Sequence, residues 1–237
     1  MDPFFEYFKR ERKNFSQKLY GRYTPSFKEY PRLPKVILPA PAGVRVALDT
    51  LLFSRQSTRK YATDAVSLET LSALLYWGFG KLHAHSNNNS DSQQRPHPSG
   101  GAKYPIEVYL IILNVEGVQS GVYHYNVPNH TLEKLPQELD LGILKNAYQY
   151  SFVAEAGVLV CLTAIKGRSI GTYGALSYKL ELIEAGHVGQ NFYLATHALG
   201  LGCCGLAAGD TATMHDMIGL DGGNEHLVYT IAVGHKM

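Results

Sequence analysis

The chain has 237 residues, a length that suits one large domain or one domain with extensions. Hydrophobic residues make up 45% of it and charged residues 18%, which is ordinary globular composition and excludes a disordered chain. The formal net charge is +2, from 22 basic and 20 acidic residues, so charge gives no argument for nucleic acid or an acidic membrane as a partner.

The N-terminal part of the chain, residues 1–44, is predicted to be an arm that is partly extended. Residues 4–15 have the composition of a charged surface helix. Residues 23–41 contain five prolines, which exclude a continuous helix. This second segment is either an arm that wraps another surface or a disordered leader, and composition alone favours neither interpretation.

The remainder, residues 45–237, is predicted to be one domain that begins with helices. Helical spacing returns over residues 45–53. Ser67 then begins an amphipathic helix that runs to Phe79 and stops near Gly80.

A long polar loop over residues 84–98 separates these helices from a region of strands. Runs of β-branched residues and a turn at Pro128 and Asn129 indicate buried strands and a hairpin. Asp210 can cap a short helix that ends at Ile218. The predicted strands are residues 106–113, 122–127, 131–135, 157–165 and 227–233.

A long helical pattern runs from Gly174 to Leu199. Its apolar residues occur on more than one face, which is typical of a central helix or of a helix at a subunit interface. Gly186 and Gly189 lie inside it and cost about 1 kcal/mol each against alanine, which indicates close packing of another helix or of a planar ligand. Helices mixed with strands in this order predict an α+β fold, a sheet surrounded by helices.

Residues 54–61 concentrate cations and hydroxyl groups in one short segment. If the segment is extended, alternate side chains point the same way, so Arg55, Ser57 and Arg59 share one face. Two guanidinium groups and a hydroxyl on one face match a phosphate. The alternative interpretation is a solvated basic turn, which is the commoner use of such a segment.

Two further segments suit a ligand, each with an ordinary alternative. Gly100 and Gly101 follow Pro98 and Ser99, and their backbone N–H groups can reach a ring or a sugar oxygen, unless the segment is only a loop exit. Lys236 follows the last strand and can complete a phosphate site, unless it is only part of a basic tail.

Residues 200–205 spell Gly-x-Gly-x-x-Gly, the pattern of a dinucleotide-binding turn. That turn needs a strand before it and a helix after it, whereas here the long helix comes first, so we reject the dinucleotide interpretation. A glycine-rich helix exit remains, with Cys203 and Cys204 as buried small residues in a tight turn.

Cysteine usage and the apolar runs indicate a reducing cytoplasm and no membrane span. The three cysteines are too few for a disulfide framework, and the apolar stretches are far shorter than the about 20 residues that a membrane helix needs. The first residues do not resemble a signal peptide. No acidic residue or cysteine joins His83, His85 and His97 at metal-ligand spacing, so we expect no metal site.

Taken together and in this order, these segments resemble the nitroreductase family, in particular its SagB-type branch, the peptide thiazoline/oxazoline dehydrogenases. Each motif is weak by itself, but five in the right order are fairly specific. The similar segments are residues 27–31 with 37–39, 55–59, 98–105, 184–187 with 190–191, and 198–202.

The resemblance implies an α+β fold with a central, mostly antiparallel sheet flanked by helices, a long central helix at a homodimer interface, and FMN bound at that interface. It implies two-electron reduction of an acceptor through the flavin, with NAD(P)H as the donor. Carried over by position, the flavin site would consist of Arg55, Gln56, Ser57, Arg59, Pro98, Ser99, Gly100, Gly101, Gln190, Cys204, Gly205, Leu206, His235 and Lys236.

One departure concerns a Lys-Tyr pair that acts in proton removal in the azoline-oxidising branch. Here the pair falls on Thr172 and Tyr173, so the lysine is missing and Tyr173 is the candidate catalytic residue. Phenols ionise well above neutral pH and are poor bases there. Three hypotheses stay open: an FMN-dependent reductase of small molecules, an azoline dehydrogenase acting on a peptide, and a non-catalytic flavin-binding module.

Overall fold

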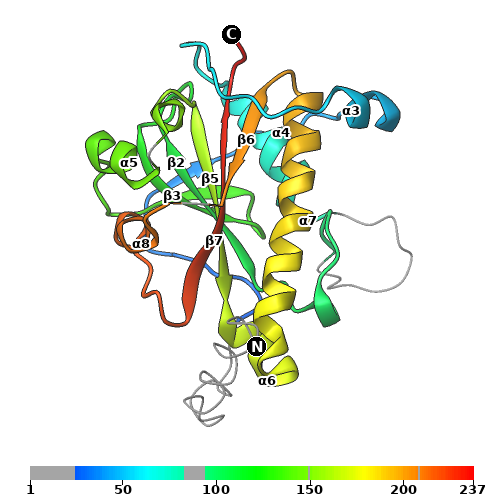
Figure 1. Cartoon of the computed structure of the whole chain (residues 1–237), viewed down its shortest axis with the longest axis vertical. Helices are drawn as coiled ribbons and strands as arrows, with labels where there is room; N and C mark the ends of the chain where they lie inside the picture. Colours follow the sequence, from blue (N-terminus) through cyan, green and yellow to red (C-terminus); the bar gives the residue numbers. More distant parts are fainter. Residues whose placement is uncertain (1–24, 83–93, 149, 208) are drawn as a thin grey trace, which may run out of the picture.

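The computed structural model describes residues 25–82, 94–148, 150–207 and 209–237. Within these residues the chain forms a seven-stranded sheet in the order β1-β4-β3-β2-β5-β7-β6, and every neighbouring pair is antiparallel. Helices cover both faces of this sheet (Figure 1). The fold is therefore α+β, with a central antiparallel sheet flanked by helices, as the sequence predicts.

Helices separate several of the consecutive strands along the chain. The strands are β1 (Lys35–Ile37), β2 (Ile106–Ile112), β3 (Gly121–Asn126), β4 (Thr131–Lys134), β5 (Val158–Ile165), β6 (Gly202–Leu206) and β7 (Glu225–Gly234). The helices are α3 (Leu48–Ser54), α4 (Leu68–Phe79), α5 (Leu141–Tyr148), α6 (Lys166–Tyr173), α7 (Leu176–Ala198) and α8 (Thr211–Ile218), with short 3-10 helices η1 (Gly100–Ala102) and η2 (Ser151–Ala154).

The two faces of the sheet bury alternate side chains of the same strands, because successive residues of a strand point to opposite faces. On β2, Val108 and Leu110 belong to the core beneath α4 and α7. Tyr109 and Ile111 belong to the core beneath α5 and α8. Since helices cover both faces, β2 and β5 are buried along their whole lengths.

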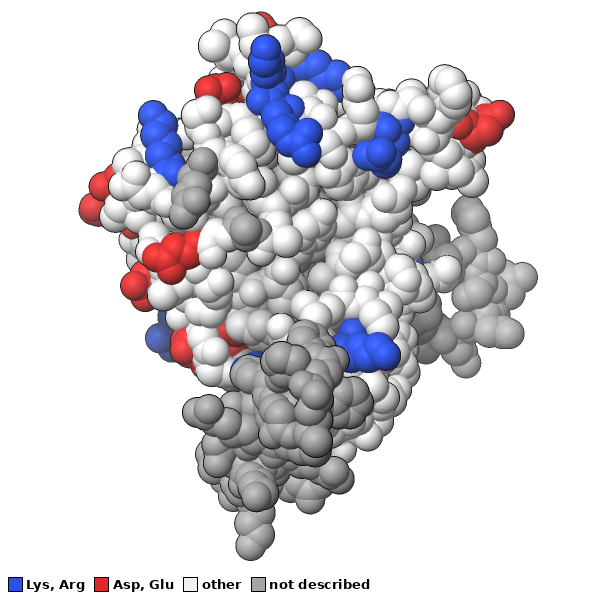
Figure 2. Space-filling model, in the orientation of Figure 1, with Lys and Arg blue, Asp and Glu red and all other residues white. Residues whose placement is uncertain are grey.

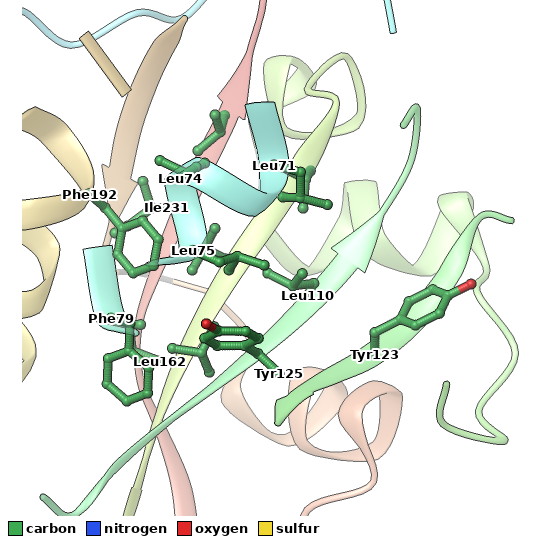
Figure 3. Packing of buried hydrophobic residues seen from close by; sticks show 14 of the residues in the cluster. Leu71, Leu74, Leu75, Phe79, Leu110, Tyr123, Tyr125, Leu162, Phe192 and Ile231 are labelled. Carbon is green, nitrogen blue, oxygen red and sulfur yellow. The ribbon is translucent and has the colours of Figure 1, made fainter. Parts of the chain in front are cut away.

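Helices α4 and α7 approach each other closely at Gly78. A Cβ atom at this position would lie 2.7 Å from the ring of Phe192, so only glycine allows the approach. Figure 3 shows Phe192 of α7 close to Leu74 of α4 and to Ile231 of the sheet, in one buried cluster. This contact fixes α7 against α4 on one face of the sheet.

Buried charges hold residues 25–44 against the sheet. Lys28 Nζ donates to the hydroxyl of Tyr109 at 2.7 Å and pairs with Glu225. The N–H of Tyr30 donates to Glu133 Oε2 at 2.9 Å. Strand β1 then pairs with β4, so the described part of this N-terminal segment is an integral part of the sheet.

His124 lies between two buried carboxylates beneath the same segment. Its Nε2 is 3.1 Å from Glu107 and its Nδ1 is 3.0 Å from Glu133, while Arg168 also pairs with Glu107. Burial alone would lower the pKa of His124, but the hydrogen bonds and charges of the two carboxylates raise it. Burial alone would raise the pKa of Glu107, but the Arg168 charge and the His124 hydrogen bond lower it to about 2.

The strand predictions are confirmed, with ends within two residues of the observed ones. The predicted helix starts are confirmed as well. Ser67 Oγ accepts the N–H of Thr70 at 3.1 Å, and Asp210 Oδ1 accepts the N–H of Ala212 at 3.2 Å. The predicted helix at residues 45–53 is α3, displaced slightly along the chain.

Of two predictions about the second half of the chain, one is confirmed and one is wrong. The long helical pattern predicted from Gly174 to Leu199 is α7, and Gly174, with a φ of 54°, ends the separate helix α6 before α7 begins. The glycine-rich segment after α7 is not a tight turn but strand β6, which pairs with β7. The predicted helix at residues 4–15 and most of the polar loop lie outside the described residues.

Candidate functional site

Two segments from opposite ends of the chain meet beside the β6 edge of the sheet. Residues 55–61 leave α3 in an extended conformation. The N–H of Thr58 donates to the carbonyl oxygen of Cys203 at 2.7 Å, and Tyr61 forms an antiparallel bridge with Lys236. The basic segment therefore runs beside β6 and the end of β7, extended as the phosphate interpretation requires.

Arg55, Arg59 and Lys236, here called the cation cluster, gather at this place. Burial lowers the pKa of His197, and the charges of Lys236 and Arg55 lower it further. Burial raises the pKa of the Cys204 thiol, and the charge and hydrogen bond of Arg59 offset part of that rise. Figure 2 shows Lys and Arg side chains at the end of the molecule where the C-terminus lies.

Tyr193 of α7, which the sequence analysis missed, connects β6 to the extended segment of residues 55–61. Its hydroxyl oxygen accepts the N–H of Gly205 at 2.7 Å and lies 3.1 Å from Ser57 Oγ. The guanidinium carbon of Arg55 lies 5.4 Å from the centre of the Tyr193 ring, a cation–π distance. The N–H of Gly205, predicted to face a ligand, is thus engaged within the chain.

His197, one turn further along α7, was also missed. Its Nε2 accepts the N–H of Gln56 at 3.1 Å, and its Nδ1 lies 3.2 Å from the carbonyl oxygen of Tyr193. These two contacts identify Nδ1 as the protonated nitrogen of a neutral ring. The spacing of Gln190, Tyr193 and His197 along one face of the helix is the sequence signal that could have indicated them.

The second predicted segment forms a strained turn before β2. Ser99 Oγ donates to Glu184 Oε2 at 2.5 Å and accepts the N–H of Tyr104 at 2.8 Å. Gly101, Ala102 and Tyr104 have φ angles of 58°, 52° and 46°. Residues other than glycine rarely adopt this left-handed region, so the surrounding contacts must hold the turn in place.

Tyr173, at the end of α6, directs its hydroxyl toward this turn. A Cβ atom on Gly101 would lie 2.3 Å from the Tyr173 oxygen, so a side chain at position 101 would collide with it. A Cβ atom on Gly100 would lie 3.4 Å from Leu180 of α7. The candidate catalytic residue and the predicted ring-binding segment are therefore in contact.

The predicted site residues fall mainly into two groups along α7. From Glu184 to Tyr193 the helix rises about 14 Å, which separates the groups. Gln190 lies between them on the exposed side of α7, and the side chain of Leu206 is buried in the core beneath α5 and α8. One group consists of Arg55, Gln56, Ser57, Arg59, Cys204, Gly205, His235 and Lys236, and the other of Pro98, Ser99, Gly100, Gly101 and Tyr173.

A cavity of about 1140 Å³ lies elsewhere, between the N-terminal segment, the hairpin of β3 and β4, and η2. Its charged lining residues are Asp64, Lys134, Glu138 and Glu155. Three carboxylates and one ammonium group do not suit a phosphate. Although the cavity is large, its charges do not match the anion that the cation cluster indicates.

The described residues contain no group of three or more His, Cys, Asp or Glu side chains placed to hold a metal ion. Of the three histidines near the polar loop only His97 is described, and its ring stacks on Phe79. Among the described helices, none combines the length and the apolar character that crossing a membrane requires.

Comparison of the sequence with known proteins gives matches to a family model and to individual relatives. A family model described as "Nitroreductase family" matches residues 52–235. The chain is 32% identical over 168 residues to the putative nitroreductase MJ1384 of Methanocaldococcus jannaschii, covering 69% of this chain and 79% of that protein. It is 31% identical to the microcin B17-processing protein McbC of Escherichia coli, covering 58% of this chain and 51% of that protein.

Solved structures share the fold at low sequence identity. A putative nitroreductase from Ralstonia eutropha matches with a TM-score of 0.71 and 23% identity, covering 91% of this chain and 95% of that one. A chain of the E. coli microcin synthetase McbBCD complex with truncated pro-MccB17 matches with a TM-score of 0.67 and 22% identity. This match covers 100% of this chain and 95% of that one. A putative nitroreductase from Desulfovibrio desulfuricans in complex with FMN matches with a TM-score of 0.55 and 20% identity. This match covers 81% of this chain and 87% of that one.

Proposed function

The chain belongs to the nitroreductase family, and on that basis we propose that it is an FMN-dependent oxidoreductase. When bound, FMN supplies the two-electron redox step between a donor such as NAD(P)H and an acceptor such as a nitro compound, a quinone or oxygen. The protein binds and orients the flavin and controls access to it.

The observation that carries this proposal is the cation cluster. Arg55, Arg59 and Lys236 come from opposite ends of the chain, and no ion pair in the described part of the chain involves any of them. Cations that gather without a carboxylate repel one another, and a phosphate dianion would compensate them. Ser57 adds a hydroxyl donor on the same segment.

The strained turn supports the other end of the proposed site. Gly100 and Gly101 present backbone without side chains, which allows a planar ring to lie close. Ser99 and Glu184 hold the turn from behind, so its N–H groups keep one direction. Tyr173 stands beside the turn and is the group placed to hold or move a proton at its hydroxyl oxygen.

We propose a homodimer in which each site is shared between two protomers. Large apolar side chains are exposed on α3 and α7, as on surfaces that associate; they are Leu48 at 62%, Leu52 at 56%, Phe53 at 95%, Leu176 at 51% and Ile183 at 45%. Figure 1 shows α3 projecting from the body beside the last turns of α7. A two-fold axis across α7 would bring the strained turn of one protomer to the cation cluster of its partner.

A flavin titration tests the cofactor. We expect the wild type to bind FMN more tightly than riboflavin, which lacks the phosphate. Arg55→Gln with Lys236→Gln should weaken FMN binding at least about tenfold and leave riboflavin binding unchanged. Arg32→Gln, an exposed cation on the other edge of the sheet, is the matched control. A wild type that binds no flavin, or binds both equally, would overturn the proposal.

Mixed dimers test the sharing of sites. One protomer carries Arg55→Gln and Lys236→Gln, and its partner carries Gly101→Ala, so that a shared arrangement leaves one intact site per mixed dimer. We expect such dimers to bind about half as much FMN as the wild type, while each parent binds little. Mixed dimers that bind no more than the parents would show that both groups serve the same site within one chain.

A second candidate function is oxidation of peptide azolines. The similarity to McbC, a microcin B17-processing protein, favours it. Thr172 stands where the azoline-oxidising branch has a lysine, which argues against efficient proton removal. Thr172→Lys should therefore raise turnover of an azoline peptide without changing FMN affinity, and an unchanged turnover would remove this candidate.

A further inference from the structure

The hydroxyl of Tyr193 connects β6 to the segment that carries the cation cluster. The N–H of Gly205 donates to the Tyr193 oxygen at 2.7 Å, and that oxygen lies 3.1 Å from Ser57 Oγ. Tyr193 and Ser57 are 136 residues apart in the chain, so the contact is purely tertiary. Both side chains are partly buried, which shields the contact from competing water.

The direction of these hydrogen bonds follows from the donors available. A backbone N–H can only donate, so the bond from Gly205 uses one lone pair of the Tyr193 oxygen. The Tyr193 proton is then free to be donated to Ser57 Oγ. If Ser57 Oγ accepts the Tyr193 proton, the Ser57 hydroxyl can still donate its own proton to a further acceptor on the side of Arg55. An anion held by the cation cluster is such an acceptor, because it has lone pairs and no proton to give.

We propose that Tyr193 is a positioning residue for the anion site, acting through a relay in which Gly205 N–H donates to Tyr193, Tyr193 donates to Ser57, and Ser57 donates to a phosphate oxygen. This inference rests on the proposed function. Hydrogen bonds in such a chain polarise one another, so each strengthens the next. The guanidinium carbon of Arg55 also lies 5.4 Å from the centre of the Tyr193 ring. Tyr193 therefore orients both the Ser57 hydroxyl and a guanidinium group.

The test compares FMN with riboflavin, because only FMN carries the phosphate that the relay serves. Tyr193→Phe keeps the ring beneath Arg55 and removes the hydroxyl. We expect it to weaken FMN binding about threefold to tenfold and to leave riboflavin binding unchanged. Tyr125→Phe is the matched control, because it removes a hydroxyl that bonds His130 at 2.8 Å, far along the sheet from β6. Its ratio of FMN to riboflavin affinity should equal that of the wild type.

Ser57→Ala completes a double-mutant cycle. Alone it should weaken FMN binding about tenfold or more, since it removes the donor to the anion itself. In the Ser57→Ala background, Tyr193→Phe should have no further effect on FMN binding, because the relay is already cut. Additive losses would overturn the relay and leave Tyr193 a structural residue.

The outcomes separate this inference from the proposed function. A wild type without preference for FMN over riboflavin would overturn both. A wild type that prefers FMN, with Tyr193→Phe keeping that preference in full, would overturn only the relay. If Tyr193→Phe does not fold by circular dichroism, Ser57→Ala decides, because it removes the relay's donor to the anion and leaves Tyr193 intact. A folded Ser57→Ala variant that keeps the full preference for FMN would equally overturn the relay.

Discussion

The hydroxyl oxygen of Ser99 lies 2.5 Å from Glu184 Oε2 and accepts the N–H of Tyr104 at 2.8 Å. We expect Ser99→Ala to lower the free energy of unfolding by about 1–3 kcal/mol, because a buried carboxylate and a backbone N–H each lose a partner. Urea unfolding measures this. Ser120→Ala is the control, since its exposed hydroxyl bonds only a carbonyl oxygen, and it should change stability by less than about 0.5 kcal/mol. Equal losses in the two variants would contradict the expectation.

Gly101→Ala should be more costly than Gly117→Ala, a substitution at another left-handed glycine that has open space around it. The new Cβ would lie 2.3 Å from the Tyr173 oxygen, in addition to the strain of a φ of 58°. We expect a loss of about 2–5 kcal/mol in the free energy of unfolding, from backbone strain and overpacking together. Gly117→Ala, with a φ of 69° and no atom within 4 Å, should cost only the strain, about 1–2 kcal/mol.

The collision at Gly101 involves a single atom of Tyr173, so removing that atom should relieve it. After the hydroxyl oxygen, the next atom of Tyr173 is its ring carbon Cζ at 3.4 Å, an ordinary contact distance. In a Tyr173→Phe background, the cost of Gly101→Ala should therefore fall to that of Gly117→Ala. A double-mutant cycle by urea unfolding measures the difference, and a cost that stays unchanged would place the Tyr173 hydroxyl elsewhere in solution.

The sequence predicted those elements whose local chemistry is sufficient to specify them. Strands β2 and β5 are continuous β-branched and aliphatic runs, which suit a strand buried on both faces. Ser67 and Asp210 are good N-caps, and both begin helices as expected. Strand β6 could not be predicted this way, because its two glycines have low strand propensity and the segment forms a strand here by pairing with β7.

The candidate site was predictable only where the chemistry lies within one segment. Arg55, Ser57 and Arg59 suggest a phosphate because alternate residues of an extended segment share a face. The spacing of Tyr193 and His197 places them on one face of α7, but their roles depend on partners 136 and 141 residues away, which no local pattern contains. Only the folded chain, which sets α7 beside the extended segment, brings those groups within hydrogen-bond distance.

Glu107→Gln should strongly lower the free energy of unfolding, because Glu107 helps to hold the N-terminal segment against the sheet. Glu107 pairs with Arg168 and His124, and its Oε1 accepts the N–H of Lys28 at 3.3 Å. A neutral amide leaves the buried Arg168 without its counter-charge and leaves His124 with Glu133 alone, which costs about 3–5 kcal/mol in the free energy of unfolding. Glu116→Gln, an exposed carboxyl, is the control and should be nearly neutral.

The effect of Glu107→Gln should also depend on pH. The pKa of Glu107 is lowered in the folded chain to about 2 from 4.5, so the stability it contributes is fully present above about pH 4.5. That contribution is lost as the pH falls through about 2, where the wild type becomes protonated at the same position. The difference in unfolding free energy between wild type and variant should shrink over this range, and a constant difference would argue against the ionised carboxylate.

His226 should weaken the fold in mild acid. Its Nε2 lies 3.8 Å from Glu181, and an ion pair there would raise the pKa of the histidine and lower that of the carboxyl. Burial has the opposite effect on each and is the larger influence. It lowers the pKa of His226 to about 4, with help from the charges of Lys166 and His215, and it raises the pKa of Glu181. We therefore regard His226 as neutral above about pH 4 rather than as half of an ion pair.

The consequence for stability follows from proton binding. The folded-state pKa of His226 lies below the ordinary value of 6.5, so between these values the unfolded chain binds more protons than the folded one. The free energy of unfolding should fall by up to about 3 kcal/mol as the pH drops from 6.5 to 4. His226→Gln should remove that part of the slope, whereas His187→Gln, on the exposed side of α7, should retain it. Urea unfolding at several pH values measures the slopes, and parallel losses in wild type and His226→Gln would assign the acid sensitivity to other groups.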